Sequence, residues 1–125
     1  MATPDTMFER YGGLEFVTRL VLNFYDRVVG SVRLAPFFAN TDMQRLVQHQ
    51  AKFISFVMGG PPSYANATLQ AVHAHQHIDD QAFDEAIRLF RATLEDSEVA
   101  AADVTAIIAD LNARRPYIVR SRAEA

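Results

Sequence analysis

No cysteine occurs among the 125 residues of the chain. Disulfide bonds, thiolate zinc sites and cysteine nucleophiles are therefore excluded together. Long apolar runs are also lacking, since none approaches the roughly 20 residues that a membrane-spanning helix needs. The N-terminal MATPDTMFERYGG has acidic residues where a signal peptide would be apolar. We expect a soluble, cytoplasmic protein that does not insert into a membrane.

A strong excess of charge of either sign is lacking as well. The formal net charge is -3, which gives no electrostatic reason to bind nucleic acid. Apolar residues make up 50% of the sequence and charged residues 22%, a composition that excludes a disordered chain. The length suits one domain that spans residues 1–125 and encloses a single core.

Apolar residues recur at helical spacing in four stretches, and no stretch alternates as a strand would. This spacing predicts helices over residues 14–29, 42–58, about 80–94 and about 99–114. Gly30 ends the first helix, and Pro116 is expected to stop the last one. The pattern therefore predicts an all-α protein.

The starts of two predicted helices carry residues that can accept hydrogen bonds from free backbone N–H groups. Thr41 or Asp42 can cap the second helix, and Asp79 or Asp80 can cap the third. Residues 31–40, SVRLAPFFAN, contain a proline and paired phenylalanines and suit a tight turn or one turn of 3₁₀ helix.

Three of the four histidines lie at alternate positions in LQAVHAHQHIDD, residues 69–80. On a strand, His73, His75 and His77 would share one face, as the ligands of a zinc site do. On a helix, only His73 and His77 would lie together. Solvated surface histidines are the third interpretation. The segment offers only a turn or two of helix, and its spacing leaves all three interpretations open.

Two polar residues lie on otherwise apolar helix faces. Gln50 shares its face with Val47 and Phe53, and Tyr25 lies beside Phe24. Burying an amide without a partner costs about 1–3 kcal/mol, so each of the two is either a satisfied core residue or part of a polar spot in an apolar pocket. A flat, largely apolar ligand held by one histidine nitrogen, such as haem, is compatible with these residues.

The order and spacing of several short motifs resemble the truncated haemoglobins of group I, small globins with a two-on-two helical sandwich. The resemblance covers nearly the whole chain. Its motifs are YGG (11–13), NFYDRVV (23–29), PFF (36–38), TDMQRL leading into HQAKF (41–53), FVMGGPPSY (56–64), AVH (71–73) and RRPYIV (114–119).

The resemblance implies a role for each residue of a haem site. His73 matches the proximal iron ligand, which leaves His75 and His77 as surface residues, and Leu46 matches the position where many globins place a histidine gate. Tyr25 and Gln50 match the distal hydrogen-bond donors, which favour high oxygen affinity. The remaining residues match the pocket wall: Phe38, which stacks on the porphyrin, and Phe24, Phe53 and Ile54.

His49 matches a position where some relatives bind a haem propionate and others supply a sixth iron ligand. We favour contact with a propionate or with solvent, because Tyr25 and Gln50 already make a coherent site for O₂. Haem is expected to be noncovalent haem b, because the chain has no CxxCH motif and no histidine in its last helix, where a family member forms a covalent link.

The function that the resemblance implies is reversible binding of O₂, and also of CO and NO, as in oxygen transport. It also implies an NO dioxygenase reaction, which would need a separate reductase because the chain has no room for a flavin or nicotinamide domain. We expect a monomer or a weak dimer. One alternative is a bis-histidine haem protein, with His73 and His49 on the iron, in electron transfer or in redox or gas sensing. Another is a helical binding module without a cofactor.

Overall fold

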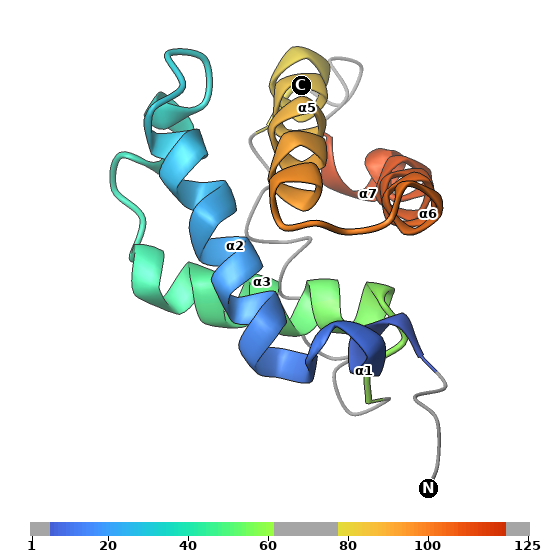
Figure 1. Cartoon of the computed structure of the whole chain (residues 1–125). Helices are drawn as coiled ribbons and strands as arrows, with labels where there is room; N and C mark the ends of the chain where they lie inside the picture. Colours follow the sequence, from blue (N-terminus) through green and yellow to red (C-terminus); the bar gives the residue numbers. More distant parts are fainter. Residues whose placement is uncertain (1–5, 62–77, 120–125) are drawn as a thin grey trace, which may run out of the picture.

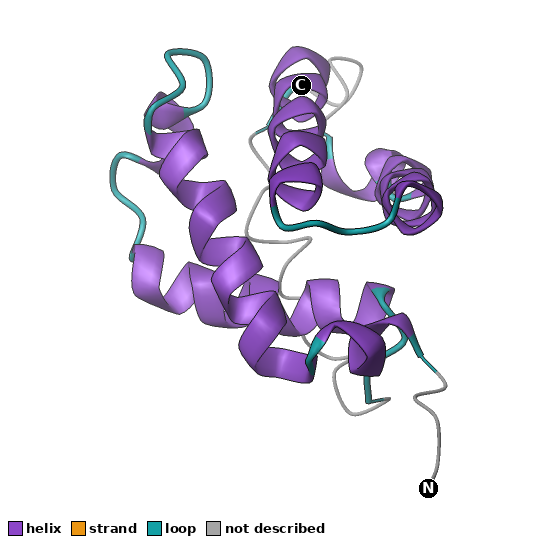
Figure 2. Ribbon diagram, viewed as in Figure 1, coloured by secondary structure: helices purple, strands orange, loops and turns teal. Residues whose placement is uncertain are grey.

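The computed structural model describes residues 6–61 and 78–119. Every regular element in these two ranges is helical (Figure 2), as the sequence predicts. The elements are α1 (Met7–Tyr11), α2 (Gly13–Val29), the 3₁₀ helix η1 (Ala35–Phe38), α3 (Met43–Val57), α5 (Asp80–Asp96), α6 (Ala101–Ala113) and α7 (Arg115–Ile118).

The helices form two layers, α2 with α3 and α5 with α6. Figure 1 shows α2 crossing α3 on one side of the molecule, with α5 and α6 on the other. Helix α2 packs against both α3 and α5, so it joins the layers, and α1 packs at the beginning of α2. This arrangement is the two-on-two helical sandwich that the sequence predicts. Among the described residues, no helix is both long enough and apolar enough to cross a membrane.

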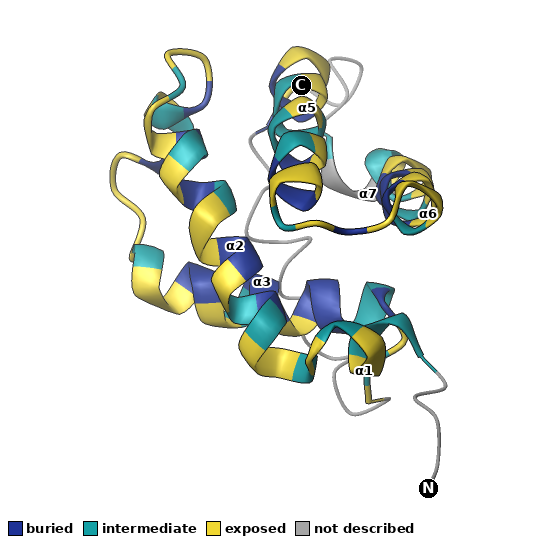
Figure 3. Ribbon diagram, in the orientation of Figure 1, coloured by how far each residue is buried: buried dark blue, intermediate teal, exposed yellow. Residues whose placement is uncertain are grey.

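Helix α2 begins and ends at glycines. Gly12 has a φ of 119°, a backbone conformation that side chains with a Cβ rarely adopt, and it lets the chain turn sharply from α1 into α2. The residues of α2 that face the core recur at helical spacing, and Figure 3 shows buried segments alternating with exposed ones along this helix. They are Val17, Leu20, Val21, Tyr25 and Val28.

Aspartate side chains cap α3 and α5. Asp42 accepts a hydrogen bond of 3.2 Å from the Arg45 N–H, and Asp79 accepts one of 2.8 Å from the Ala82 N–H. Of the paired candidates in the sequence, these two are therefore the caps. Helix α3 ends at Val57, as the following glycines predict.

The structure differs from the sequence prediction at the two ends of the chain. Helix α1 was not predicted, because five residues are too few to show a helical period. Pro116 does not end the last long helix, since α6 already ends at Ala113. It lies instead in the first turn of the short α7, where its missing N–H would have no helical partner in any case.

Candidate functional site

A largely apolar cavity lies between α2, α3 and α5. Tyr25 and Gln50 are its only strongly polar lining residues among the part of the chain that the structure describes. The other lining residues are Val21, Phe24, Val28, Leu34, Phe38, Phe53, Ile54, Ile78, Phe83, Ala86, Ile87, Phe90 and Leu111. An apolar cavity with a few buried polar groups is the usual composition of a small-molecule site.

Tyr25 lies one turn before the end of α2, with 5% of its surface exposed. Its ring meets the edges of two other aromatic rings, Phe24 at 4.9 Å and Phe38 at 5.8 Å between centroids, and these contacts orient it. Burial raises the pKa of its hydroxyl above the ordinary value, because the charged phenolate would lose its water. The hydroxyl therefore stays protonated at physiological pH and can act as a hydrogen-bond donor.

Gln50 lies on α3 with 6% of its surface exposed. Phe53 and Ile54 follow it by three and four positions, so the three side chains share one face of the helix, and all three line the cavity. The amide of Gln50 carries two N–H donors on a side chain that keeps its charge state across the pH range. Tyr25 and Gln50 thus bring hydrogen-bond donors from two helices to one apolar cavity.

The aromatic wall contains both predicted and unpredicted residues. Phe24 and Phe38, which the resemblance assigns to the wall, line the cavity. The ring of Phe24 also contacts that of Phe90, 5.1 Å away with planes at 86°. Phe90 belongs to a set on α5 that the sequence analysis did not assign to the site. The set is Phe83, Ala86, Ile87 and Phe90. Their helical spacing was visible, but nothing in it distinguishes a cavity wall from plain core.

Two predicted site residues on α3 lie outside this lining. Leu46 is buried one turn before Gln50, and His49 is partly exposed. Neither is among the residues that line the cavity. His73, with His75 and His77, lies outside the described residues.

A metal ion could also be held by side chains alone, without a cofactor. Within residues 6–61 and 78–119, no three histidine or acidic side chains come together as metal ligands would. The zinc interpretation of His73, His75 and His77 concerns residues outside these ranges.

The fold and the cavity define a class of protein: a small helical sandwich with an apolar cavity between its layers. The sequence comparisons then identify the family. The family model described as bacterial-like globin matches residues 6–119. A group 1 truncated hemoglobin of Tetrahymena pyriformis is 31% identical over 96 residues, which cover 77% of this chain and 79% of that protein. The chain belongs to the bacterial-like globin family, as a truncated haemoglobin of group 1.

Further relatives agree with this assignment. The group 1 truncated hemoglobin GlbN of Mycolicibacterium paratuberculosis is 38% identical over 77 residues, which cover 62% of this chain and 57% of that protein. Among solved structures, the Fe(III) form of truncated hemoglobin from Tetrahymena pyriformis aligns with 94% of this chain and all of its own. It has a TM-score of 0.81 at 27% identity. The all-α globin fold predicted from the sequence is confirmed.

The cofactor of this chain is noncovalent haem b with its iron. The described residues fit this group in chemistry, because aromatic and aliphatic side chains suit the porphyrin faces and the two buried donors suit a small polar ligand. They line a cavity of about 90 Å³.

Proposed function

We propose that this globin binds O₂ reversibly at haem and that Tyr25 and Gln50 stabilise the bound gas. One observation carries the proposal: two buried hydrogen-bond donors, from α2 and α3, line the same apolar cavity. Haem supplies the iron atom to which a diatomic gas binds. CO and NO are further ligands of the same site.

Several residues would hold the haem. His73 is the proposed iron ligand, on the strength of its place in the AVH motif. The rings of Phe24, Phe38 and Phe53 and the side chain of Ile54 would pack against the porphyrin, since all four line the cavity. Leu46, which matches the gate position, does not line the cavity and supplies no third donor.

The two donors would act on the charge of the ligand. O₂ becomes partly negative when it binds, and an O–H from Tyr25 and an N–H from Gln50 would then stabilise it and slow its release. The apolar wall strengthens these hydrogen bonds, because little water competes for them. Such a site favours high oxygen affinity, which suits scavenging or oxidation chemistry better than delivery.

NO dioxygenation is the enzymatic form of this proposal. One NO and one O₂ combine with one electron to give one nitrate ion, and the electron would come from a separate reductase. Tyr25 and Gln50 would serve this reaction by retaining O₂ until NO arrives. Steady consumption of NO in the presence of O₂ and a reductant, with stoichiometric nitrate, is the measurement that supports it.

The bis-histidine alternative would place His49 on the iron opposite His73. His49 is partly exposed and is not among the residues that line the cavity, which favours contact with a propionate or with solvent instead. A role in electron transfer or sensing through His49 is therefore the weaker proposal.

The absorption spectrum of the purified protein, oxidised and reduced, tests these functions together. A five-coordinate ferrous spectrum that changes reversibly with O₂ is the expected result. Sharp low-spin bands in the gas-free ferrous protein would support the bis-histidine alternative. A colourless protein that takes up no added haem would refute gas binding and leave the cofactor-free helical module.

A further inference from the structure

Two consecutive arginines, Arg114 and Arg115, lie at the junction of α6 and α7, within the RRPYIV motif. The guanidinium of Arg114 lies over the ring of Phe53, with its carbon 5.4 Å from the ring centroid. That of Arg115 lies over the ring of Phe83, 4.4 Å from the centroid. Both rings line the haem cavity. The two arginines therefore contact the wall of the site without lining it themselves.

Carboxylates fix the position of both guanidinium groups, and Arg115 also contacts one amide. The Nε of Arg114 donates to Asp110 at 2.6 Å, one turn earlier on α6. Arg115 donates to Asp80 at 2.9 Å, and also to Asp84 and to Asn112. A guanidinium held at its N–H edge by acids keeps its flat face available for a ring. The polar contacts thus orient the two arginines for stacking.

The two rings belong to different layers of the sandwich. Phe53 is on α3, in the layer with α2, whereas Phe83 is on α5, in the layer with α6. One dipeptide therefore contacts both walls between which the haem lies. The link from Arg115 to Asp80 and Asp84 also holds the first turn of α5, directly after the buried Ile78, which lines the same cavity.

We propose that Arg114 and Arg115 are positioning residues for the cofactor: they hold the Phe53 and Phe83 rings against the haem and so slow its loss from the protein. This inference rests on haem binding in the cavity between α3 and α5. Lysine could keep the positive charge at either position, but it lacks the planar face that stacks on a ring. Lysine variants therefore separate stacking from charge.

Arg88 offers a matched control. It makes two contacts with Glu85, at 2.7 and 2.9 Å, on the exposed face of α5. It does not line the haem cavity. Arg88→Lys therefore changes an arginine–carboxylate pair with two contacts on α5, the helix that carries Phe83. The wall of the site is not altered.

The experiment measures haem loss from the ferric protein to an excess of an apo-globin acceptor whose haem-bound spectrum is distinct. Arg114→Lys and Arg115→Lys should each speed haem loss by about three- to tenfold, the range expected for losing one cation–π contact. The double variant should lose haem at about the product of the two effects, since the rings lie on separate walls. Arg88→Lys should stay within about twofold of the parent.

Two further readouts separate positioning from general stability. The Soret circular dichroism of the holoprotein, which depends on aromatic rings near the haem, should change in Arg114→Lys and Arg115→Lys and not in Arg88→Lys. Urea unfolding of the apoproteins should show similar losses in all three variants. Faster haem loss that only parallels lower apoprotein stability would overturn the proposal, as would lysine variants that retain haem like the parent. A parent without any Soret band would instead refute haem binding itself.

Discussion

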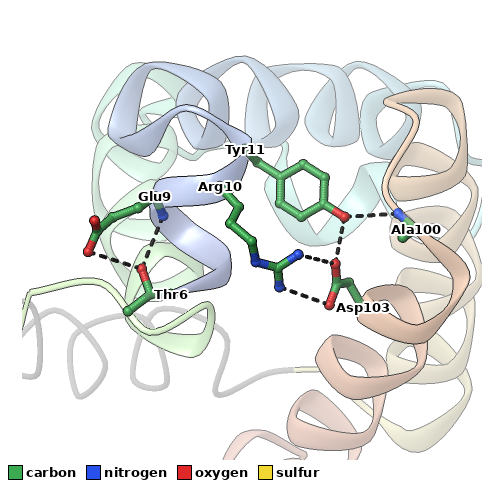
Figure 4. Close-up of polar contacts among 6 residues, drawn as sticks. All are labelled: Thr6, Glu9, Arg10, Tyr11, Ala100 and Asp103. Atoms are coloured by element: carbon green, nitrogen blue, oxygen red, sulfur yellow. Dashed lines mark hydrogen bonds and ion pairs between the residues drawn. The ribbon is translucent and has the colours of Figure 1, made fainter. Parts of the chain in front are cut away.

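The hydroxyl of Tyr11 donates a hydrogen bond of 2.6 Å to Oδ2 of Asp103, which joins residues 92 positions apart in the chain (Figure 4). The hydroxyl oxygen of Tyr11 also accepts a hydrogen bond of 3.0 Å from the N–H of Ala100. Ala100 is the N-cap of α6, and Tyr11 supplies for its backbone N–H the acceptor that the side chain at the third helical position supplies in a capping box. The N-terminal helix α1 thus stabilises the start of α6.

Tyr11→Phe should therefore lower the free energy of unfolding by about 1 kcal/mol, the usual net value of such a hydrogen bond. The ring contact with Phe16, 5.5 Å between centroids, would remain. Urea unfolding of the apoprotein measures the change. Asp103→Asn and the double variant complete a double-mutant cycle, and additive effects of the two changes would show that the hydrogen bond contributes nothing to stability.

The Asp103 carboxyl should also make stability depend on pH. Hydrogen bonds from Tyr11 and then from Arg10 hold its pKa below the ordinary value of 3.8. Since the folded state binds the proton less tightly than the unfolded state, the stabilisation is complete above pH 3.8 and is lost as the pH falls through the lower folded pKa. The stability difference between the parent and Asp103→Asn should accordingly shrink in acid. A difference that stayed constant across this range would contradict the assignment.

The sequence predicted the long helices because each has a face that repeats at 3.6 residues and a recognisable end. Asp42 and Asp79 were each one of two candidate caps before an apolar period, and the structure chooses between the candidates. The partnership of Tyr11 with Asp103 could not be predicted, because a single sequence does not show which distant residues meet. Pro116 was misjudged for a local reason: proline stops a helix from within but also suits the first turn of a new one.

The site was predictable where a polar residue interrupted an apolar face. Tyr25 and Gln50 stood out in this way, and both line the cavity. Phe83 and Phe90 gave no such signal, since an apolar residue has the same pattern in a cavity wall as in the core. Arg114 and Arg115 were visible only as part of a family motif, because the rings that they cover lie far away in the sequence.

His73 is expected to be essential for haem retention, because it would supply the only strong bond from the protein to the iron. His73→Ala should lose haem or hold it loosely. His75→Ala and His77→Ala are the matched controls two and four residues away, and they should leave the absorption spectrum almost unchanged. Loss of haem in either control variant but not in His73→Ala would show that the iron ligand is the histidine replaced in that control.

His49 is expected to have little effect on the iron. Were it a sixth ligand, His49→Ala would convert a six-coordinate ferrous spectrum to a five-coordinate one and speed CO binding, because no internal ligand would need to leave first. We expect little change in either measurement, since His49 does not line the cavity. Flash photolysis of the CO complex gives the rate, and a large acceleration would establish the bis-histidine alternative.

The last prediction concerns the two buried donors. Removing one hydrogen bond to O₂ should cost about 1–2 kcal/mol, which corresponds to roughly five- to thirtyfold faster O₂ release. Tyr25→Phe is the cleaner change, because it removes only a hydroxyl and keeps the ring that contacts Phe24 and Phe38. Gln50→Leu removes the amide and keeps most of the volume on α3.

CO provides the control for this pair, because its terminal oxygen carries much less negative charge when it binds. Tyr25→Phe should therefore raise the O₂ release rate far more than the CO release rate, and Gln50→Leu should act in the same direction. The double variant should be non-additive if both donors address one oxygen atom or each other. Stopped-flow release rates of both gases, in the parent and the three variants, test this. Equal effects on O₂ and CO would mean that Tyr25 and Gln50 act through packing, because a change in the shape of the cavity does not depend on the charge of the gas.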